Sequence, residues 1–191
     1  MAQASLSLKA SKLEVERYYD ATAESYDDLY REEQYAKYRA AFKLLGNLKA
    51  STILDAGCGT GLLFNQLKGF KDLVGVDLSR QMLLKAKQKA ASNPNIHLVK
   101  CDLEHLPFRS GVFNACFAFT VLQNLPNPRK ALRELSRVLG EGAAVAVTLM
   151  DGAERLPTSG EVLKLLGLRA ALALRVRRER VLAGFTSPGK R

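Results

Sequence analysis

A glycine-rich turn directly after a buried strand is the feature that most constrains how this chain can fold. Residues 49–56 lead into a run of apolar and β-branched residues typical of a strand, which ends in Asp55-Ala56-Gly57-Cys58-Gly59-Thr60-Gly61. The glycines allow a tight turn and let backbone N–H groups approach a ligand closely. The spacing alone also fits a nicotinamide-dependent enzyme. However, the run is G-x-G-x-G and not the dinucleotide fingerprint G-x-G-x-x-G. Asp55 would also oppose a pyrophosphate and favour a ligand that carries positive charge.

Strand and helix patterns alternate along the rest of the chain. Further strands are predicted at residues 73–76, 96–99, 112–119 and 143–149, and helices at residues 62–67, 80–91, 128–139 and 161–166. Ser79 and Asn127 are expected N-caps, Pro128 a first helical residue, and Gly140 the end of its helix. Residues 168–176 and 179–185 form two closing strands with no helix between them, so one should run antiparallel. These patterns predict an α/β fold with a mostly parallel seven-stranded sheet and helices on both faces.

Acidic residues follow the next two predicted strands. In open sheets of this kind, ligands bind beyond the carboxyl ends of the strands. Asp77 ends the second strand, where it could accept hydrogen bonds from both hydroxyls of a ribose. Asp102 follows the third, where it could accept from an exocyclic amine, while Leu103 offers a backbone N–H and an apolar cover. Taken alone, Asp102 could equally be a surface residue. Together with the glycine turn and Asp77, however, it gives three successive strand ends with residues suited to one ligand.

Together these segments resemble a known family. Residues 54–61, 74–79, 99–107 and 113–125 are similar to class I S-adenosylmethionine-dependent methyltransferases, in the branch that includes ubiquinone and menaquinone methyltransferases, and the resemblance covers roughly residues 18–150. It implies a Rossmann-like fold and S-adenosylmethionine as cofactor. It also implies that the glycines and Asp55 hold the methionine part, Asp77 the ribose, and Asp102 and Met82 the adenine. The expected cofactor-binding residues are Tyr19, Tyr26, Asp55, Gly57, Gly59, Gly61, Asp77, Leu78, Met82, Asp102, Leu103 and Phe119.

All six tyrosines lie between residues 18 and 38. This stretch looks like the helical lid that precedes the methyltransferase core, so we divide the single domain into a lid segment (residues 1–48) and a core (residues 49–191). Phenol rings give rigid apolar walls suited to covering a sulfonium. We expect Tyr19 and Tyr26 to contact cofactor or acceptor, and Tyr35 and Tyr38 to pack the helices onto the sheet.

No strong general base is evident. A methyl group on a sulfonium is already activated, so alignment for in-line displacement can supply much of the acceleration. The catalytic candidates are Tyr26, Gln123 and Asn124; His105 is expected to be solvated and His97 structural. The Asn-Pro-Pro-Tyr pattern of enzymes that methylate exocyclic amines of bases is absent after the fourth strand, which argues against that chemistry.

The net charge and the cysteines indicate which partners and which cellular compartment to expect. The net charge is +10, with five basic and no acidic residues at 80–100, and seven basic residues against one acid at 167–191. Such clusters attract polyanions, although residues 80–100 could equally be the solvated face of a helix. The three cysteines lack C-x-x-C spacing, so neither a metal site nor a disulfide framework is predicted. Without a secretory signal or a long apolar run, we expect a cytoplasmic protein with no membrane association.

The acceptor is left open between three hypotheses. Charge favours an RNA methyltransferase acting on rRNA or tRNA. Residues 30–45 and 54–62 also loosely resemble small-subunit ribosomal RNA guanine methyltransferases, which use a small zinc-binding activator subunit. Exposed Phe117 or Val112 could contact such a partner. The alternatives are a small-molecule methyltransferase acting on a quinone-like or other metabolite under the tyrosine lid, and a non-catalytic cofactor-binding scaffold.

Overall fold

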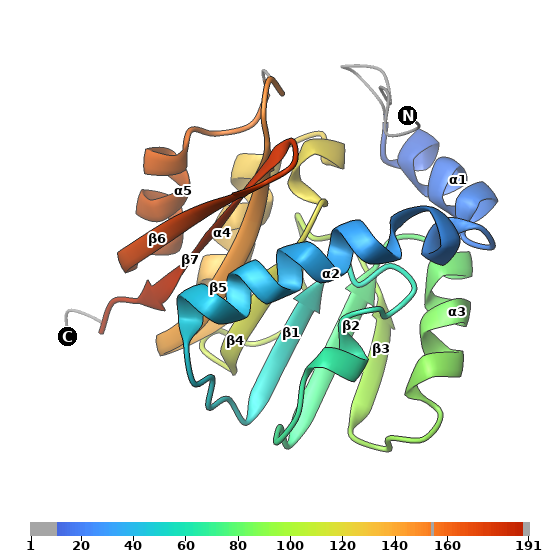
Figure 1. Ribbon diagram of the computed structural model, residues 1–191, viewed down its shortest axis with the longest axis horizontal. Coiled ribbons are helices and arrows are strands. Elements are labelled where there is room, and N and C mark those ends of the chain that lie inside the picture. Colours follow the sequence, from blue (N-terminus) through green and yellow to red (C-terminus); the bar gives the residue numbers. More distant parts are fainter. Residues whose placement is uncertain (1–10, 154, 189–191) are drawn as a thin grey trace.

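One seven-stranded sheet, in the order β3-β2-β1-β4-β5-β7-β6, organises the computed structural model, which describes residues 11–153 and 155–188. Figure 1 shows helices on both sides of this sheet. The strands are β1 (Thr52–Ala56), β2 (Asp72–Asp77), β3 (Ile96–Lys100), β4 (Phe113–Ala118), β5 (Leu139–Met150), β6 (Leu168–Val176) and β7 (Glu179–Thr186). The helices are α1 (Lys12–Thr22), α2 (Tyr26–Leu45), α3 (Arg80–Ala90), α4 (Pro128–Val138) and α5 (Ser159–Leu166), with the 3₁₀ turns η1 (Phe64–Gln66) and η2 (Leu122–Asn124).

Strand direction follows the prediction. Strands β1 to β5 pair in parallel, and β7 runs antiparallel to both β5 and β6, so β7 is the one reversed strand of the sheet. The seven-stranded, mostly parallel α/β architecture is therefore confirmed. The strand order reverses between β1 and β4, which places a crevice beyond their carboxyl ends.

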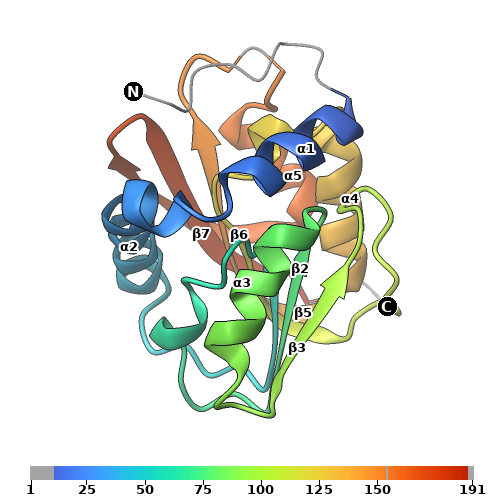
Figure 2. The ribbon, with the colours of Figure 1, turned by 90° about the vertical axis from the view of Figure 1, so that its right-hand side faces the viewer.

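Each face of the sheet has its own hydrophobic core. Successive residues of a strand point to opposite faces, so Leu54 packs with α4 and α5, while Ile53 packs with α2, α3 and η1. Figure 1 shows α2 crossing the sheet in front of β1 and β4. In Figure 2, α1 lies across the edge where the parallel strands end. Among the described residues, no helix is both long and apolar enough to cross a bilayer.

Three local predictions were wrong. Residues 62–67 form only the 3₁₀ turn η1, because Leu62, Leu63 and Phe64 are consecutive and all buried, a pattern that one face of an α-helix cannot satisfy. Helix α4 ends at Val138, and Gly140 lies within β5 instead of capping the helix. Phe117 is fully buried in the sheet, so it is not an exposed partner contact. Val112 is 39% exposed, as expected.

Helix starts follow the predicted caps. The Ser79 side chain accepts a hydrogen bond from the backbone N–H of Met82 at the start of α3. The Asn127 side chain accepts one from Lys130, with Pro128 as the first residue of α4. These side chains satisfy N–H groups that have no partner within their helices. The cap at Ser79 also fixes where the chain leaves β2, and this is the point at which the candidate site begins.

Candidate cofactor site at the carboxyl edge of the sheet

A pocket lies beyond the carboxyl ends of β1, β2, β3 and β4, with α1 and the start of α2 on its other side. Every one of these four strands contributes the residues that follow it. From the expected set, the lining residues are Tyr19, Tyr26, Gly57, Gly59, Asp77, Leu78, Met82, Asp102, Leu103, Phe119 and Asn124. Three expected residues, Asp55, Gly61 and Gln123, do not line it. Thr120, which follows Phe119, also lines it, and the unforeseen lining residues are Lys12, Val15, Glu16, Ser79, Cys101, Val121, Leu125 and Pro126.

The turn after β1 is held against the end of β2. The side chain of Asp77 accepts hydrogen bonds from the backbone N–H groups of Gly59 and Ser79, both at 2.9 Å. Burial raises the pKa of Asp77, although these backbone donors oppose the shift. Gly57 has a φ of +76°, and a Cβ there would lie 2.6 Å from a methyl carbon of Val121. Glycine at position 57 therefore allows both the turn and the close approach of the loop after β4.

Asp55 lies on β1, one residue before the strand ends, and is only 4% exposed. Its Oδ2 atom has no hydrogen-bond partner among the described residues. Burial, together with the negative charge of Asp77, raises the pKa of Asp55 to about 8. A buried carboxyl group of this kind lacks a compensating partner and would be stabilised by a bound cationic group.

Asp102 is already engaged by the lid segment. Its Oδ2 atom lies 2.5 Å from Nζ of Lys12 on α1, and the same amine lies 2.9 Å from Glu104. The backbone N–H of Glu104 and the ring of His105 also bond to Asp102. Although partial burial opposes the shift, these partners hold the pKa of Asp102 below its ordinary value. Asp102, which is predicted to bind adenine, thus lines the pocket and also anchors α1 through Lys12.

Two lid tyrosines line the pocket, with ring centroids 6.4 Å apart. The hydroxyl of Tyr19 accepts a hydrogen bond from Asn124 at 2.7 Å, and that of Tyr26 accepts one from Gln34 at 3.3 Å. Burial raises the pKa of both phenols well above the ordinary value, so both stay neutral at physiological pH. They can act as apolar walls and as hydrogen-bond donors.

The remaining aromatic and polar candidates lie elsewhere. Tyr38 packs on Phe119, with ring centroids 5.0 Å apart, and its partner Tyr35 also lies outside the pocket lining. Gln123 is half-buried, and its Oε1 has no partner among the described residues. His105 is exposed and contacts Lys130.

His97 on β3 is exposed as well and pairs with Asp72 at 3.0 Å. Neither histidine of the chain lines the pocket. Within the described ranges, no group of three or more His, Cys, Asp or Glu side chains is placed to hold a metal ion.

The fold and the pocket together define an α/β protein with a pocket at the switch point of its sheet. Residues 54–147 match a family model described as a methyltransferase domain. A demethylmenaquinone methyltransferase of Staphylococcus aureus is 33% identical over 145 residues, which cover 72% of this chain and 60% of the relative. The chain thus spans less than two thirds of the length of that relative.

Solved structures share the fold. A putative methyltransferase of Haloferax volcanii, in complex with the Trm112 methyltransferase activator, has a TM-score of 0.77 and 15% identity, covering 93% of this chain and 99% of the other. The N-methyltransferase NodS of Bradyrhizobium japonicum, with S-adenosylhomocysteine, has a TM-score of 0.73 and 17% identity, covering 92% and 99%. With the family match, these findings support one class: the chain is similar to the class I S-adenosylmethionine-dependent methyltransferases, whose cofactor is S-adenosylmethionine.

Proposed function

We propose that this protein transfers the methyl group of S-adenosylmethionine to RNA, ribosomal or transfer RNA, with the cofactor bound in the pocket at the carboxyl edge of the sheet. The observation that carries the choice of acceptor is a cluster of arginines on the β6–β7 turn, at the same edge of the sheet as the pocket. Different residues support the cofactor and the acceptor.

The residues around the pocket fit the cofactor. Asp77 lines the pocket and would accept ribose hydroxyls, and the positive-φ glycines, Gly57 and Gly59, would let backbone N–H groups approach a ligand. Asp55, which does not itself line the pocket, offers a buried oxygen without a partner among the described residues, which fits the ammonium group of the methionine part. Asp102 and Leu103 line the pocket and would bind adenine, with the carboxylate of Asp102 shared between Lys12 and the base.

S-adenosylmethionine supplies a methyl group activated by its sulfonium, so the protein's task is alignment. The neutral rings of Tyr19 and Tyr26 border the pocket and suit cation–π contact with a sulfonium. Asn124 fixes the hydroxyl of Tyr19 and is itself exposed to the pocket, where it can hold an acceptor. No strong base is required when the acceptor carries a free lone pair.

The acceptor surface is the arginine turn, which we define as Arg175, Arg177, Arg178 and Arg180. All four side chains are exposed. The turn lies at the carboxyl edge because Met150, the last residue of β5, pairs with Glu179, and the N–H of Asp151 donates to the carbonyl of Arg178 at 2.7 Å. The arginine turn therefore lies beside the site where β4 and β5 end.

Among the described residues, the charge of the arginine turn exceeds that of its ion-pair partners. Three of its four arginines pair there with two carboxylates, Asp151 and Glu33, and Glu33 is shared with Lys37. The side chains of Arg175 and Arg177 are 71% and 66% exposed, so these ion pairs are weak and can be exchanged for phosphate. Guanidinium groups bind phosphate through two parallel hydrogen bonds, and a phosphate polymer releases counterions on binding.

The test is transfer of labelled methyl groups from S-adenosylmethionine to total RNA, with and without RNase. We expect label that RNase removes, and a loss of about tenfold or more in the double variant Arg175→Gln/Arg178→Gln. The matched control is Arg169→Gln, which removes an exposed arginine of the same hairpin at the opposite edge of the sheet. Equal transfer by all three proteins, or label that resists RNase, would rule out this acceptor surface.

A small activator subunit is part of the proposal. Its support is the Haloferax volcanii methyltransferase of the same fold, which is in complex with the Trm112 activator. The RNA assay is therefore run with this chain alone and with a purified activator of that kind. A rise in methyl transfer or in protein solubility on addition is the expected result. Identical methyl transfer and solubility with and without the subunit would show that the protein does not use this partner.

A small-molecule acceptor is the second candidate. Its support is the 33% identity to a demethylmenaquinone methyltransferase and the position of the pocket beneath the tyrosine-bearing helices. Methylation of a metabolite in a cell extract that persists after RNase treatment would favour this second candidate. A cofactor affinity of millimolar or weaker would instead favour a non-catalytic scaffold.

A further inference from the structure

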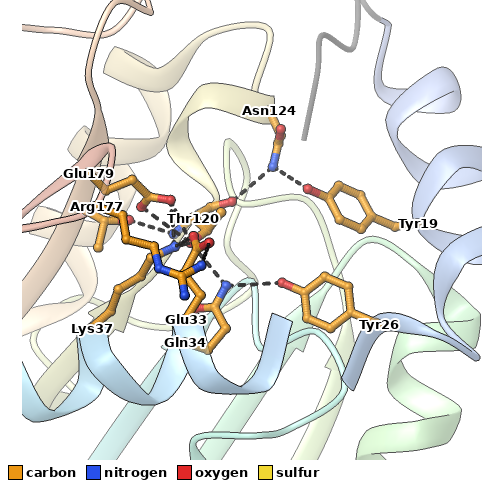
Figure 3. A network of polar contacts seen from close by, with 10 residues as sticks. Tyr19, Tyr26, Glu33, Gln34, Lys37, Thr120, Asn124, Arg177 and Glu179 are labelled. Atoms are coloured by element: carbon orange, nitrogen blue, oxygen red, sulfur yellow. Dashed lines mark hydrogen bonds and ion pairs between the residues drawn. The ribbon is translucent and has the colours of Figure 1, made fainter. Parts of the chain in front are cut away.

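We propose that Lys37 and Glu179 are positioning residues for methyl transfer. They hold Thr120, and through it they orient the hydroxyl groups of Tyr19 and Tyr26 at the pocket. The proposal rests on the proposed function for the identity of the bound ligand. It concerns a buried network that lies behind the pocket wall, between α2, β7 and the loop after β4 (Figure 3).

Thr120 is the centre of this network. Its hydroxyl accepts hydrogen bonds from Lys37 at 2.7 Å and Gln34 at 3.2 Å, and donates to Glu179 at 3.2 Å. A threonine hydroxyl has one hydrogen to donate and two lone pairs, so its capacity is full. Its backbone N–H donates to Thr148 at 2.6 Å. Thr120 has a φ of +56°, a backbone conformation that a β-branched residue rarely adopts.

Two side-chain amides connect Thr120 to the lid. The carbonyl of Thr120 accepts from Nδ2 of Asn124 at 3.0 Å, and the same nitrogen donates to Tyr19 at 2.7 Å. Nε2 of Gln34, which donates to the Thr120 hydroxyl, also donates to Tyr26 at 3.3 Å. Each phenol oxygen is the acceptor in its bond. Its own hydrogen is thereby available for a different partner, such as a molecule bound in the pocket that both rings line.

The ion pair between Lys37 and Glu179, which both contact Thr120, is unusual for side chains whose only role is packing. Lys37 is fully buried, Glu179 is 2% exposed, and Nζ and Oε1 are 2.6 Å apart. Replacing a buried ion pair by apolar residues of similar size is often neutral or stabilising, so the fold alone does not require these charges. Strained backbone that its surroundings over-determine is concentrated at functional sites. The pair therefore serves to hold Thr120 in one orientation.

The same network ends at the arginine turn. Glu33 lies 2.8 Å from Nζ of Lys37 and 3.1 Å from the guanidinium of Arg177. Figure 3 shows these three side chains together with Glu179 and Thr120, while Tyr19 and Tyr26 lie on the other side of the view. One set of contacts thus joins the proposed RNA surface to the pocket-lining tyrosines.

The sequence provides a direct readout. The chain has no tryptophan, and its six tyrosines all lie between residues 18 and 38. Tyrosine absorbance and fluorescence therefore report on α1 and α2 alone. In the folded protein, a change in the hydrogen bonds of Tyr19 or Tyr26 alters this signal, whereas a local change in the sheet away from α1 and α2 does not.

The experiment compares the full chain with the double variant Lys37→Met/Glu179→Leu, using S-adenosylhomocysteine as the probe. We expect the wild type to bind the probe with a tyrosine difference spectrum. The double variant should keep its thermal transition, lose most of that spectrum and bind about tenfold more weakly. The control is Asn114→Ala, which removes an acceptor of three hydrogen bonds at the opposite edge of the sheet and should leave spectrum and affinity unchanged.

A second pair of variants decides the matter if the double variant does not fold. Thr120→Ser retains the hydroxyl and should retain the wild-type spectrum, while the isosteric Thr120→Val should lose it. A wild-type spectrum and affinity in Lys37→Met/Glu179→Leu, or in Thr120→Val, would overturn the positioning role. A wild type that does not bind S-adenosylhomocysteine would overturn the proposed function, and the positioning role with it.

Discussion

Replacing Asp55 by asparagine should stabilise the ligand-free protein at neutral pH and weaken its binding of the cofactor. The carboxyl group is 4% exposed, and one of its oxygens has no partner among the described residues. Burial and the charge of Asp77 raise its pKa from 3.8 to about 8. The unfolded chain loses this proton near pH 4, whereas the folded chain keeps it until about pH 8. Stability from this group is therefore present below pH 4 and is lost as pH rises to about 8.

The size of the effect follows from the pKa values. A pH of 7 lies about three units above the ordinary pKa of this carboxyl group, and each unit corresponds to ~1.4 kcal/mol. Keeping Asp55 protonated in the folded chain at pH 7 therefore costs on the order of 4 kcal/mol. The amide of asparagine does not titrate, but a buried amide with an unmet hydrogen bond costs ~1–3 kcal/mol. A net gain of ~1–3 kcal/mol is expected at pH 7, which raises the melting temperature by several degrees in a domain of this size.

The assay is thermal unfolding of both proteins from pH 4 to pH 9, with calorimetric titration of S-adenosylhomocysteine at pH 8. The wild type should lose stability across this range relative to Asp55→Asn, and the variant should bind at least tenfold more weakly. Glu141→Gln, at an exposed position on β5, controls for the loss of a carboxyl group as such. Parallel pH profiles for wild type and Asp55→Asn, or a less stable variant at pH 8, would refute the reasoning.

Two further predictions concern the walls of the pocket. Lys12→Met removes the ion pairs that join α1 to Asp102 and Glu104; since Lys12 is one third exposed, the loss of global stability should stay below ~1 kcal/mol. Limited proteolysis within α1 should nevertheless become faster, and an unchanged cleavage rate would contradict the contact. Gly57→Ala places a Cβ 2.6 Å from Val121 at a φ of +76°, so unfolding in denaturant should show a loss of ~2 kcal/mol or more. Adding Val121→Ala should recover only part of this loss, because the backbone strain remains; full recovery would assign the cost to the clash alone.

Much of the fold could be predicted from local patterns. The strands were recognised from short apolar runs, and the helix starts at Ser79 and Asn127 from residues whose side chains accept backbone hydrogen bonds. The reversed strand followed from the short connection between the last two strands. The turn η1 was missed because a run of apolar residues next to glycine fits a helix or a buried loop equally well.

The residues of the pocket could be predicted only in part. Parallel strands bring their carboxyl ends to one edge, so Asp77 and Asp102 could be placed together from their order in the chain. The contacts that complete the site join residues far apart in sequence. Lys12 meets Asp102 across 90 positions, and Lys37 meets Glu179 across 142. No periodicity or spacing encodes such pairs, because they depend on how α1 and α2 pack against the finished sheet.

The most direct test of the central claim is a calorimetric titration of the full chain with S-adenosylhomocysteine, for the wild type and for Asp77→Ala. Asp77 ends β2 inside the pocket, and its carboxylate also holds the turn at Gly59. We expect saturable binding at one site per chain, weakened at least tenfold by Asp77→Ala while α-helical content and cooperative unfolding are retained. Absence of binding by the wild type, or equal affinity in a folded Asp77→Ala variant, would contradict this expectation.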